Sequence, residues 1–378
     1  MNISRKRLTW IGVADILPWR GGLRMNSPKV LIAMSGGVDS AVAAHQIQVL
    51  GYSCIGATMQ LYFNPNKTTT DIADAKAVAD RLAIPFHVLN FQQEFCSHVI
   101  EPFIRSYENG TTPNPCIQCN RYLKFDQLLR KAMDFGCDYI ATGHYARICY
   151  EETSGRYLLK KAADPSKDQS YVLYSLTQEQ LKHTLLPLGE LTKDQVRAIA
   201  QENGFVNAHK QDSQDICFVP DGDYAAFMER YTGKAYPKGD FLNQNGDVVG
   251  QHNGAIRYTL GQRKGLGLAM GAPMYVCDKN MENNTVTVGP NEALYATSLL
   301  ANDWNWFPFP ALELPMEVVA RARYNQKEQP ATVYPEENGA ARVVFHTPQR
   351  ALTPGQAVVL YQGDLVIGGG TITSVIAD

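Results

Sequence analysis

The chain has 378 residues, a formal net charge of −2, and 45% hydrophobic and 19% charged residues. This length accommodates two or three domains, each with its own core. The balanced charge argues against a uniformly basic surface, so any contact with RNA must come from local patches. No apolar run approaches the ~20 residues of a membrane helix, so we expect no spanning segment. The eight cysteines lack the density of a small secreted scaffold, which predicts a reducing, cytoplasmic location.

Residues 1–27 form a basic extension ahead of the first predicted strand. Asp15 interrupts the basic residues, and no small-residue cleavage site follows the short apolar stretch, so the features of a targeting peptide are incomplete. Met25 lies just ahead of the strand, which favours a start assigned too far upstream. We expect a disordered extension, with a targeting peptide as the alternative.

The first predicted strand covers residues 30–34 and is followed by two glycines and a helical pattern over residues 40–50. Such a turn exposes backbone N–H groups at a helix N-terminus, and these favour an anion such as phosphate. The glycine spacing fits neither a Walker loop nor a dinucleotide-binding loop. A tight turn that merely requires glycine is the simpler alternative.

Strand-like runs then alternate with helical patterns through the first half of the chain. Strands are predicted at residues 53–59 and 86–91, on either side of a helix at residues 71–83. A second helix is predicted at residues 125–136, before a strand and loop at residues 137–146. This alternation predicts a parallel α/β sheet that binds ligands at the carboxyl ends of its strands, where the glycine turn also lies.

The second half of the chain consists of short strand-like runs between turns rich in glycine, asparagine and proline. We therefore predict a catalytic α/β domain at residues 28–217, a small β-rich central domain at residues 218–298 and a C-terminal antiparallel β-barrel at residues 299–378. A sandwich is the alternative to the barrel.

A proline-rich loop leads into a Cys-x-x-Cys pair, Cys116 and Cys119, just before a helix that carries Arg121 and Lys124. A cysteine near a helix N-terminus and cations should have a lowered pKa. A nucleophile, a redox pair and half of a metal site all remain compatible with the pair. Structural zinc is disfavoured because it needs about four ligands and no second cluster is present. Cys217, taken alone, could be an ordinary strand cysteine.

Several motifs resemble those of known enzymes. Residues 35–40, Ser-Gly-Gly-Val-Asp-Ser, resemble the PP-loop of the ATP pyrophosphatases, which cleave ATP between its α and β phosphates. Further motifs follow in the order TPNPCIQCNRYLKF, ATGHYA, KDQSYVLYSL, DSQDICF, YTLGQRKGLG, ARARYNQ and TPGQAVVLY. Together they resemble the tRNA-specific 2-thiouridylases over residues 28–378. The resemblance implies a PP-loop domain of the adenine nucleotide alpha hydrolase type, followed by a central β-rich domain at residues 218–298 that binds tRNA.

The resemblance also implies an activity. It indicates an enzyme that uses ATP and Mg²⁺ to adenylate O2 of the wobble uridine in tRNA and to replace that oxygen with sulfur, giving 2-thiouridine, AMP and pyrophosphate. Cys119 is implied as the nucleophile and Cys217 as the persulfide carrier. A cysteine desulfurase or another sulfur carrier would load Cys217, and we expect a monomer. Sulfide release and direct transfer of the terminal sulfur both leave a disulfide that a reductant must open.

Two sets of binding residues follow from the same resemblance. The ATP set comprises Ala33, Met34, Ser35, Gly36, Gly37, Val38, Asp39, Ser40, Met59 and Gly143. The tRNA set comprises Asn114, Pro115, Cys116, His144, Lys167, Asp168, Gln169, Arg323, Tyr324 and Gln356. Asp39 is also the candidate Mg²⁺ ligand, because a carboxylate oxygen suits a hard cation.

Cys116 departs from the family's pattern, since many members have an aspartate there as the candidate general acid or base. A tuned thiol can serve in that role. Alternatively, Cys116, Cys119 and Cys217 could hold a [4Fe–4S] cluster whose unique iron binds sulfide. Two other functions stay open: a PP-loop synthetase that adenylates a small molecule and needs no Cys217, and a non-catalytic RNA-binding protein that releases no AMP.

Overall fold

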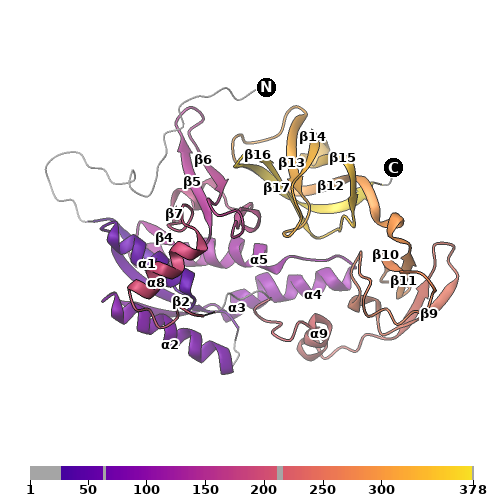
Figure 1. Ribbon diagram of the computed structural model, residues 1–378, viewed down its shortest axis with the longest axis horizontal. Helices are drawn as coiled ribbons and strands as arrows, with labels where there is room; N and C mark the ends of the chain where they lie inside the picture. The colour runs from indigo at the N-terminus through magenta and orange to yellow at the C-terminus, as the bar shows by residue number, and fades with distance from the viewer. Residues whose placement is uncertain (1–26, 63–64, 211–215, 377–378) are drawn as a thin grey trace.

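The computed structural model describes residues 27–62, 65–210 and 216–376, without the side chains of residues 65–68. All but the last residue of the predicted extension 1–27 lies outside this range. Figure 1 shows the α/β part on the left, the barrel at the upper right and the central part at the lower right. Among the described helices, none has the length and apolar character that crossing a membrane requires.

A five-stranded parallel sheet forms the centre of the α/β domain, in the order β3-β2-β1-β4-β7. Its strands are β1 (Lys29–Ala33), β2 (Ser53–Gln60), β3 (Phe86–Asn90), β4 (Tyr139–Ala141) and β7 (Thr184–Leu185). Val30, Leu31 and Ile32 of β1 are fully buried, as expected for a central strand that is covered on both faces. The sheet confirms the predicted parallel α/β domain.

One face of this sheet is covered by α1 (Val38–Val49), α2 (Pro65–Arg81) and α8 (Lys193–Glu202). The predicted apolar face of α1 is buried at Val42, Ala43 and Ile47. Both α1 and α2 begin ahead of the helical patterns predicted for them.

The other face is covered by two longer helical segments. The first runs through α3 (Gln92–Phe95), the π-helical η1 (Cys96–Ile100) and α4 (Glu101–Glu108), and the sequence analysis predicts no helix there. The second runs through α5 (Pro115–Gln118), the π-helical η2 (Cys119–Gln127) and α6 (Leu128–Asp134). It begins at Pro115, so both cysteines of the pair lie within the helical segment, and their predicted place ahead of it is wrong. The Asn114 side chain caps the segment by accepting the Cys116 N–H at 3.2 Å.

A hairpin of β5 (Ala146–Glu151) and β6 (Arg156–Lys161) connects the α/β domain to the barrel, because β6 pairs with a barrel strand at Lys160 and Leu365. The 3₁₀ turn η3 (Ser170–Leu173) and α7 (Gln178–Lys182) follow the hairpin. Arg156 donates to the carbonyls of Trp306 and Phe307 at 2.9 and 2.6 Å, which fixes this connection.

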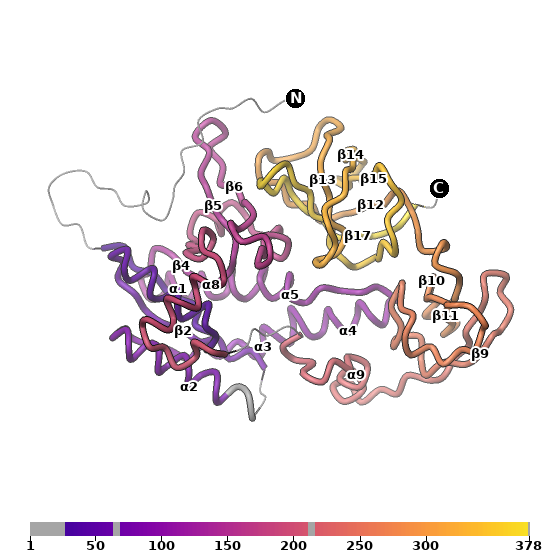
Figure 2. The backbone as a smooth tube through the Cα atoms, in the orientation of Figure 1, coloured from indigo at the N-terminus to yellow at the C-terminus, as the bar shows by residue number. Residues whose placement is uncertain are grey.

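The central domain has one helix, α9 (Tyr224–Thr232), among its described residues, and a small sheet in the order β10-β11-β8-β9. Its elements are β8 (Gly239–Leu242), β9 (Val248–His252), η4 (Ala255–Arg257), β10 (Tyr275–Asn280) and β11 (Thr285–Gly289). Phe241, Val276 and Val286 are fully buried in its core. Figure 2 shows α4 extending toward this domain, where Tyr107 stacks on Tyr224 with ring centroids 4.2 Å apart.

The C-terminal domain is a closed antiparallel barrel in the order β12-β15-β14-β13-β16-β17, with β12 paired back to β17. Its elements are η5 (Asn291–Leu294), β12 (Tyr295–Trp306), β13 (Met316–Arg321), β14 (Gln329–Pro335), η6 (Glu337–Gly339), β15 (Ala341–Arg350), β16 (Ala357–Gln362) and β17 (Leu365–Ile376). The closure confirms the predicted barrel over the sandwich.

Candidate functional site

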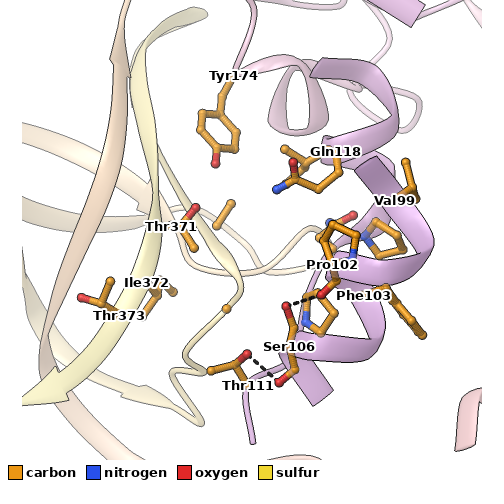
Figure 3. A pocket seen from close by; sticks show the side chains of 16 residues that line it. Val99, Pro102, Phe103, Ser106, Thr111, Gln118, Tyr174, Thr371, Ile372 and Thr373 are labelled. Carbon is orange, nitrogen blue, oxygen red and sulfur yellow. Dashed lines mark hydrogen bonds between the residues drawn. The ribbon is translucent and has the colours of Figure 1, made fainter. Parts of the chain in front are cut away.

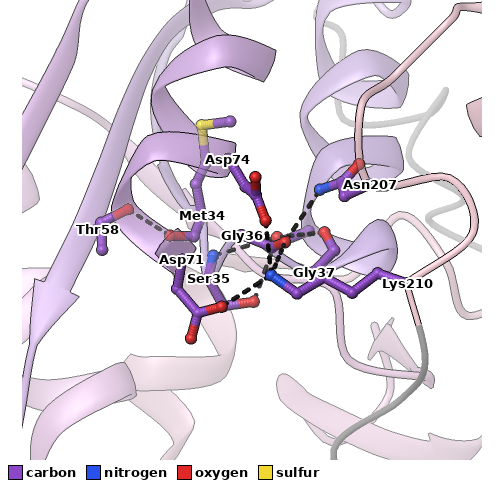
Figure 4. A network of polar contacts seen from close by, with 10 residues as sticks. Met34, Ser35, Gly36, Gly37, Thr58, Asp71, Asp74, Asn207 and Lys210 are labelled. Atoms are coloured by element: carbon purple, nitrogen blue, oxygen red, sulfur yellow. Dashed lines mark hydrogen bonds and ion pairs between the residues drawn. The ribbon is translucent and has the colours of Figure 1, made fainter. Parts of the chain in front are cut away.

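The glycine loop lies at the carboxyl edge of the parallel sheet, between β1 and α1 (Figure 4). Gly36 has a φ of 74°, a conformation that favours glycine, and an added Cβ would lie 2.3 Å from the Asp71 carbonyl oxygen. An added Cβ on Gly143, just after β4, would lie 2.8 Å from the Ser40 nitrogen. The ends of β1 and β4 therefore meet at the glycine loop, which suits a phosphate group. Met59 of the predicted ATP set lies near the end of β2, the strand that pairs with β1 on its other side.

Hydrogen bonds within the loop hold its shape. The Ser35 N–H donates to Ser40 Oγ at 3.1 Å, and the Ser40 hydroxyl donates to the Gly37 carbonyl at 3.0 Å. The Thr58 hydroxyl donates to the Met34 carbonyl at 2.6 Å. Because Ser40 is buried, its hydroxyl orders the loop in this structure.

Two residues that the sequence analysis missed hold the loop from outside. Asn207 Nδ2 and Lys210 Nζ each donate to the Gly36 carbonyl at 3.2 Å. Lys210 also contacts Asp71 at 2.8 Å and Asp74 at 2.7 Å, both on α2 (Figure 4). These contacts fix the Gly36–Gly37 peptide and dock α2 against the loop.

Asp39 is held by two further residues that the sequence analysis missed. Its Oδ1 accepts hydrogen bonds from the Tyr145 hydroxyl and from Lys193 Nζ, both at 2.7 Å. The Lys193 side chain is only 7% exposed, whereas the Asp39 side chain is 30% exposed. A carboxylate still suits Mg²⁺, and the role of Asp39 as its ligand stays a prediction.

Cys119 lies at the start of η2 and is buried, whereas Cys116, one turn earlier, is exposed. Burial raises the pKa of the Cys119 thiol to about 12; the positive charge of Lys124 opposes this rise, and Cys217 and Cys116 add to it. The prediction of a lowered pKa is therefore wrong for Cys119, because desolvation outweighs the nearby cation.

Cys217 is exposed beside this helix, and its neighbour Phe218 explains its position. The Phe218 ring is buried and contacts Phe95, Phe103 and Phe227 edge-on or tilted, with centroids 5.2 to 5.6 Å apart. This anchor places Cys217 near enough to Cys119 to influence its pKa. The two cysteines come from distant segments of the chain, and the pKa of Cys119 is sensitive to Cys217.

The three cysteines do not form a metal-binding set here. Over residues 27–62, 65–210 and 216–376, no group of three or more His, Cys, Asp or Glu side chains is arranged to hold a metal ion. The [4Fe–4S] alternative on Cys116, Cys119 and Cys217 stays a prediction.

Asp168 and Gln169 of the tRNA set form hydrogen bonds inside the protein. Asp168 accepts the Ala162 and Ser170 N–H groups at 3.1 and 3.2 Å, and Arg321 of the barrel lies 3.5 Å from it. Gln169 Oε1 accepts the Tyr145 N–H at 2.9 Å. These bonds order the loop that also carries Lys167, and direct contact with tRNA stays a prediction.

His144 and Arg323 of the same set are also engaged internally. His144 is buried with Nδ1 2.8 Å from the Thr142 hydroxyl, and burial together with Lys124 lowers its pKa well below the usual value. Arg323 donates to the Ala351 carbonyl at 2.6 Å and to the Leu260 carbonyl at 3.4 Å, which joins the barrel to the central domain. Their contact with tRNA stays a prediction as well.

Tyr324 lines a polar pocket of about 400 Å³ together with Asp168 and Arg321. Arg321, which the sequence analysis missed, donates to the carbonyls of Tyr324 and Gln326 and so holds the loop after β13. The pocket lies where the α/β domain meets the barrel, and its aromatic and charged groups suit a nucleotide.

Gln356 connects the barrel to the proline-rich loop ahead of the cysteines. Its Nε2 donates to the Thr112 carbonyl at 2.8 Å, and the Thr112 N–H donates to the Pro354 carbonyl at 2.9 Å. Asn114 and Pro115 line a separate pocket of about 350 Å³ between α4 and β17 (Figure 3). Pro115, Ile117 and Gln118 of the cysteine segment also line this pocket, although Cys116 and Cys119 themselves do not.

Comparisons with known proteins agree with this three-part layout. Three family models match the chain: a tRNA methyl transferase HUP domain at residues 28–221, a tRNA methyl transferase PRC-barrel domain at residues 225–290 and an aminomethyltransferase beta-barrel domain at residues 296–372. A tRNA-specific 2-thiouridylase of Acetivibrio thermocellus is 51% identical over 92% of this chain and 100% of its own length.

A second tRNA-specific 2-thiouridylase, from Clostridioides difficile, is 48% identical over 91% of this chain and 98% of its own length. A solved 4-thiouridine synthetase bound to RNA and ATP matches more weakly, with 16% identity and a TM-score of 0.36 over 54% of this chain and 50% of that one. From its match to full-length relatives at about half identity, the chain belongs to the tRNA-specific 2-thiouridylase family.

Proposed function

We propose that this chain is a tRNA-uridine 2-sulfurtransferase that uses ATP to activate O2 of the wobble uridine and then replaces this oxygen with sulfur. The observation that carries the proposal is the glycine loop at the carboxyl edge of the parallel sheet, which suits the phosphates of ATP. The family relatives, named as tRNA-specific 2-thiouridylases over nearly the whole chain, support it.

ATP would bind at the glycine loop, where the backbone N–H groups of residues 36–40 favour phosphate oxygens. Gly143 would let the neighbouring loop pack closely against this site. Asp39 is the candidate ligand of the accompanying Mg²⁺, which would neutralise phosphate charge there. Lys193 and Tyr145 orient the Asp39 carboxylate for that role.

In the proposed reaction, uracil O2 attacks the α-phosphorus of ATP, pyrophosphate leaves, and N3 loses its proton. Cys119 as thiolate attacks the inner sulfur of a persulfide on Cys217, which forms a Cys119–Cys217 disulfide and releases HS⁻. HS⁻ adds at C2 of the base, AMP leaves, and a proton returns to N3. Transfer of the terminal sulfur before disulfide formation gives the same products.

The partners follow from this chemistry. A cysteine desulfurase or another persulfide carrier loads the exposed Cys217, and a thiol reductant supplies the two electrons that reopen the disulfide. A reducing cytoplasm would provide this reductant. We propose that a monomer carries out the reaction. Cys116, exposed one turn ahead of Cys119, is the candidate general acid or base.

The test is one reaction with the full chain, Mg²⁺, ATP, unmodified tRNA and a persulfide donor. We expect 2-thiouridine by mass spectrometry, in equal amounts with AMP and pyrophosphate, and its loss in Cys119→Ser and Cys217→Ser. Cys277→Ser, outside the site, is the matched control and should keep full activity. AMP without a thiolated base would contradict the proposal and favour a synthetase, and tRNA binding without AMP would favour a non-catalytic protein.

A further inference from the structure

Two adjacent cations face solvent in the turn at residues 259–264 of the central domain. Arg263 and Lys264 are both exposed. In the described part of the chain, neither side chain has a hydrogen-bond or ion-pair partner. Most other basic residues near the domain junctions are paired, as Arg257 is with Glu229 at 2.7 Å. These two charges are therefore available to an anionic partner.

The turn is held in one shape by its own hydrogen bonds. The Gln262 side chain accepts the Thr259 N–H at 3.0 Å and donates to the Lys264 carbonyl at 3.0 Å. The Gly261 N–H donates to the Val276 carbonyl at 2.8 Å, and the Val276 N–H donates to the Gln262 carbonyl at 3.0 Å, so the turn is fixed to β10. A pre-ordered backbone loses less entropy when its side chains bind a partner.

The turn also touches the barrel beside a predicted tRNA-binding residue. Arg350 donates to the Gly261 carbonyl at 3.3 Å, and Arg323 donates to the Leu260 carbonyl at 3.4 Å. An added Cβ on Gly261 would lie 2.9 Å from the Ala351 Cβ, so the contact between turn and barrel is close. The turn that carries the two cations is thus held against Arg323, a predicted tRNA-binding residue of the barrel.

We propose that Arg263 and Lys264 bind the sugar-phosphate backbone of tRNA, as a contact separate from the cysteine site. The inference rests on the proposed function, which supplies the polyanionic partner. Two neighbouring cations on a fixed turn suit phosphate groups, whose contacts position a nucleic acid without reading its bases. With a net charge of −2 over the whole chain, such local contacts are what RNA binding requires.

The experiment measures the affinity of the full chain for labelled, unmodified tRNA by fluorescence anisotropy over a range of KCl concentrations. Replacing both cations, in Arg263→Gln/Lys264→Gln, should lower the slope of log Kd against log salt by about two. The loss of affinity should be equal for tRNAs with uridine and with another base at the wobble position. Thermal unfolding of the variant should match the unaltered chain, because both side chains are exposed.

Lys238→Gln is the matched control. Lys238 is exposed in the same domain, next to β8, whose Asp240 pairs with Thr285. Thr285 lies at one end of the β10–β11 pair, whereas the turn that carries Arg263 and Lys264 contacts Val276 at the other end. Lys238 therefore lies away from that turn, and Lys238→Gln should leave the slope of log Kd against log salt unchanged.

Three results would overturn the inference: an unchanged slope in the double variant, an equal decrease in Lys238→Gln, or a loss confined to tRNA with wobble uridine. Failure of the proposed function is distinguishable, because the unaltered chain would then make no 2-thiouridine whatever the slopes show.

Discussion

At the scale of single residues, the reactivity of Cys119 depends on burial more than on its position in a helix. Its thiol lies in the hydrophobic core, and the resulting rise in pKa exceeds the effect of Lys124. Cys217 lies one residue from a buried aromatic anchor and is itself exposed. This contrast in exposure fits the proposed roles: the exposed thiol of Cys217 accepts sulfur, and the buried thiol of Cys119 attacks only a persulfide that lies nearby.

The raised pKa predicts how thiolation depends on pH. Because the Cys119 pKa is about 12, only a small fraction is thiolate at neutral pH, and this fraction rises about tenfold per pH unit between pH 7 and 9. The single-turnover rate of 2-thiouridine formation from a persulfide donor should rise with the same slope when attack by Cys119 limits the rate.

Free sulfide as donor is the control for this prediction, since it bypasses Cys119 and should not give the same slope. A rate from persulfide that levels off below pH 8 would contradict the prediction, because it would mean that the reacting thiol has a much lower pKa.

At the scale of elements, the glycine loop is held by the turn that follows α8 and by α2, which come from distant parts of the chain. Asn207 and Lys210, which follow α8, fix the Gly36 carbonyl, and Lys210 also binds α2 through Asp71 and Asp74. The backbone donors of the loop are thereby oriented before any ligand binds, which lowers the cost of ordering them.

Lys210→Met should therefore raise the KM for ATP more than it lowers kcat. The substitution leaves two carboxylates near the loop without their cation, and a lost hydrogen bond to a charged group costs about 1.5–3 kcal/mol, or roughly 10-fold to 100-fold in affinity. Steady-state pyrophosphate release in the presence of tRNA measures this effect.

Lys210→Arg, which keeps the charge, should restore most of the affinity for ATP. Lys76→Met, which removes an exposed ion pair with Asp80 on the same α2 helix, is the control and should have little effect. Equal KM values for Lys210→Met and Lys76→Met would show that Lys210 does not support the loop.

At the scale of the whole molecule, the barrel is attached to the α/β domain at points that also position the chemistry. Gln356 holds the carbonyl of Thr112 ahead of the cysteine helix, Arg321 approaches Asp168, and Arg156 donates to the Trp306 carbonyl at the end of β12. The barrel therefore supports the cysteine segment and the predicted tRNA-binding loop together.

Gln356→Leu should impair thiolation while leaving the KM for ATP unchanged. The variant leaves the Thr112 carbonyl without its side-chain donor, which costs about 1–2 kcal/mol, and it loosens the loop that leads to Cys116. Thiolation and ATP cleavage measured in parallel separate the two effects. The matched control is Gln362→Leu, whose side chain donates to Glu317 within the barrel. A rise in the KM for ATP alone would contradict this account.

Much of this architecture is predictable from periodicity alone. The alternation of strands and helices predicts the parallel sheet, and the short alternating strands predict the barrel. The sequence analysis predicts no helix over residues 92–108, although this segment contains a helical pattern of apolar residues. Phe95, Val99, Phe103 and Tyr107 are spaced four residues apart and are buried on one face of the helix.

Other features could not be predicted in this way. The contacts of Lys193, Lys210, Gln356 and Arg321 join residues more than a hundred positions apart, so no local pattern marks them. The burial that reverses the pKa prediction for Cys119 likewise depends on tertiary packing. For the predicted site residues, sequence motifs indicate the chemistry, and the fold decides which side chains are exposed to act.

The most direct measurement is the state of the cysteines after one turnover without reductant. The full chain, loaded with persulfide, is mixed with ATP, Mg²⁺ and tRNA, digested, and analysed by peptide mass spectrometry alongside the nucleosides. We expect one Cys119–Cys217 disulfide for each 2-thiouridine formed, with Cys116 still a thiol. Formation of 2-thiouridine without that disulfide, or with a disulfide at Cys116 instead, would contradict it.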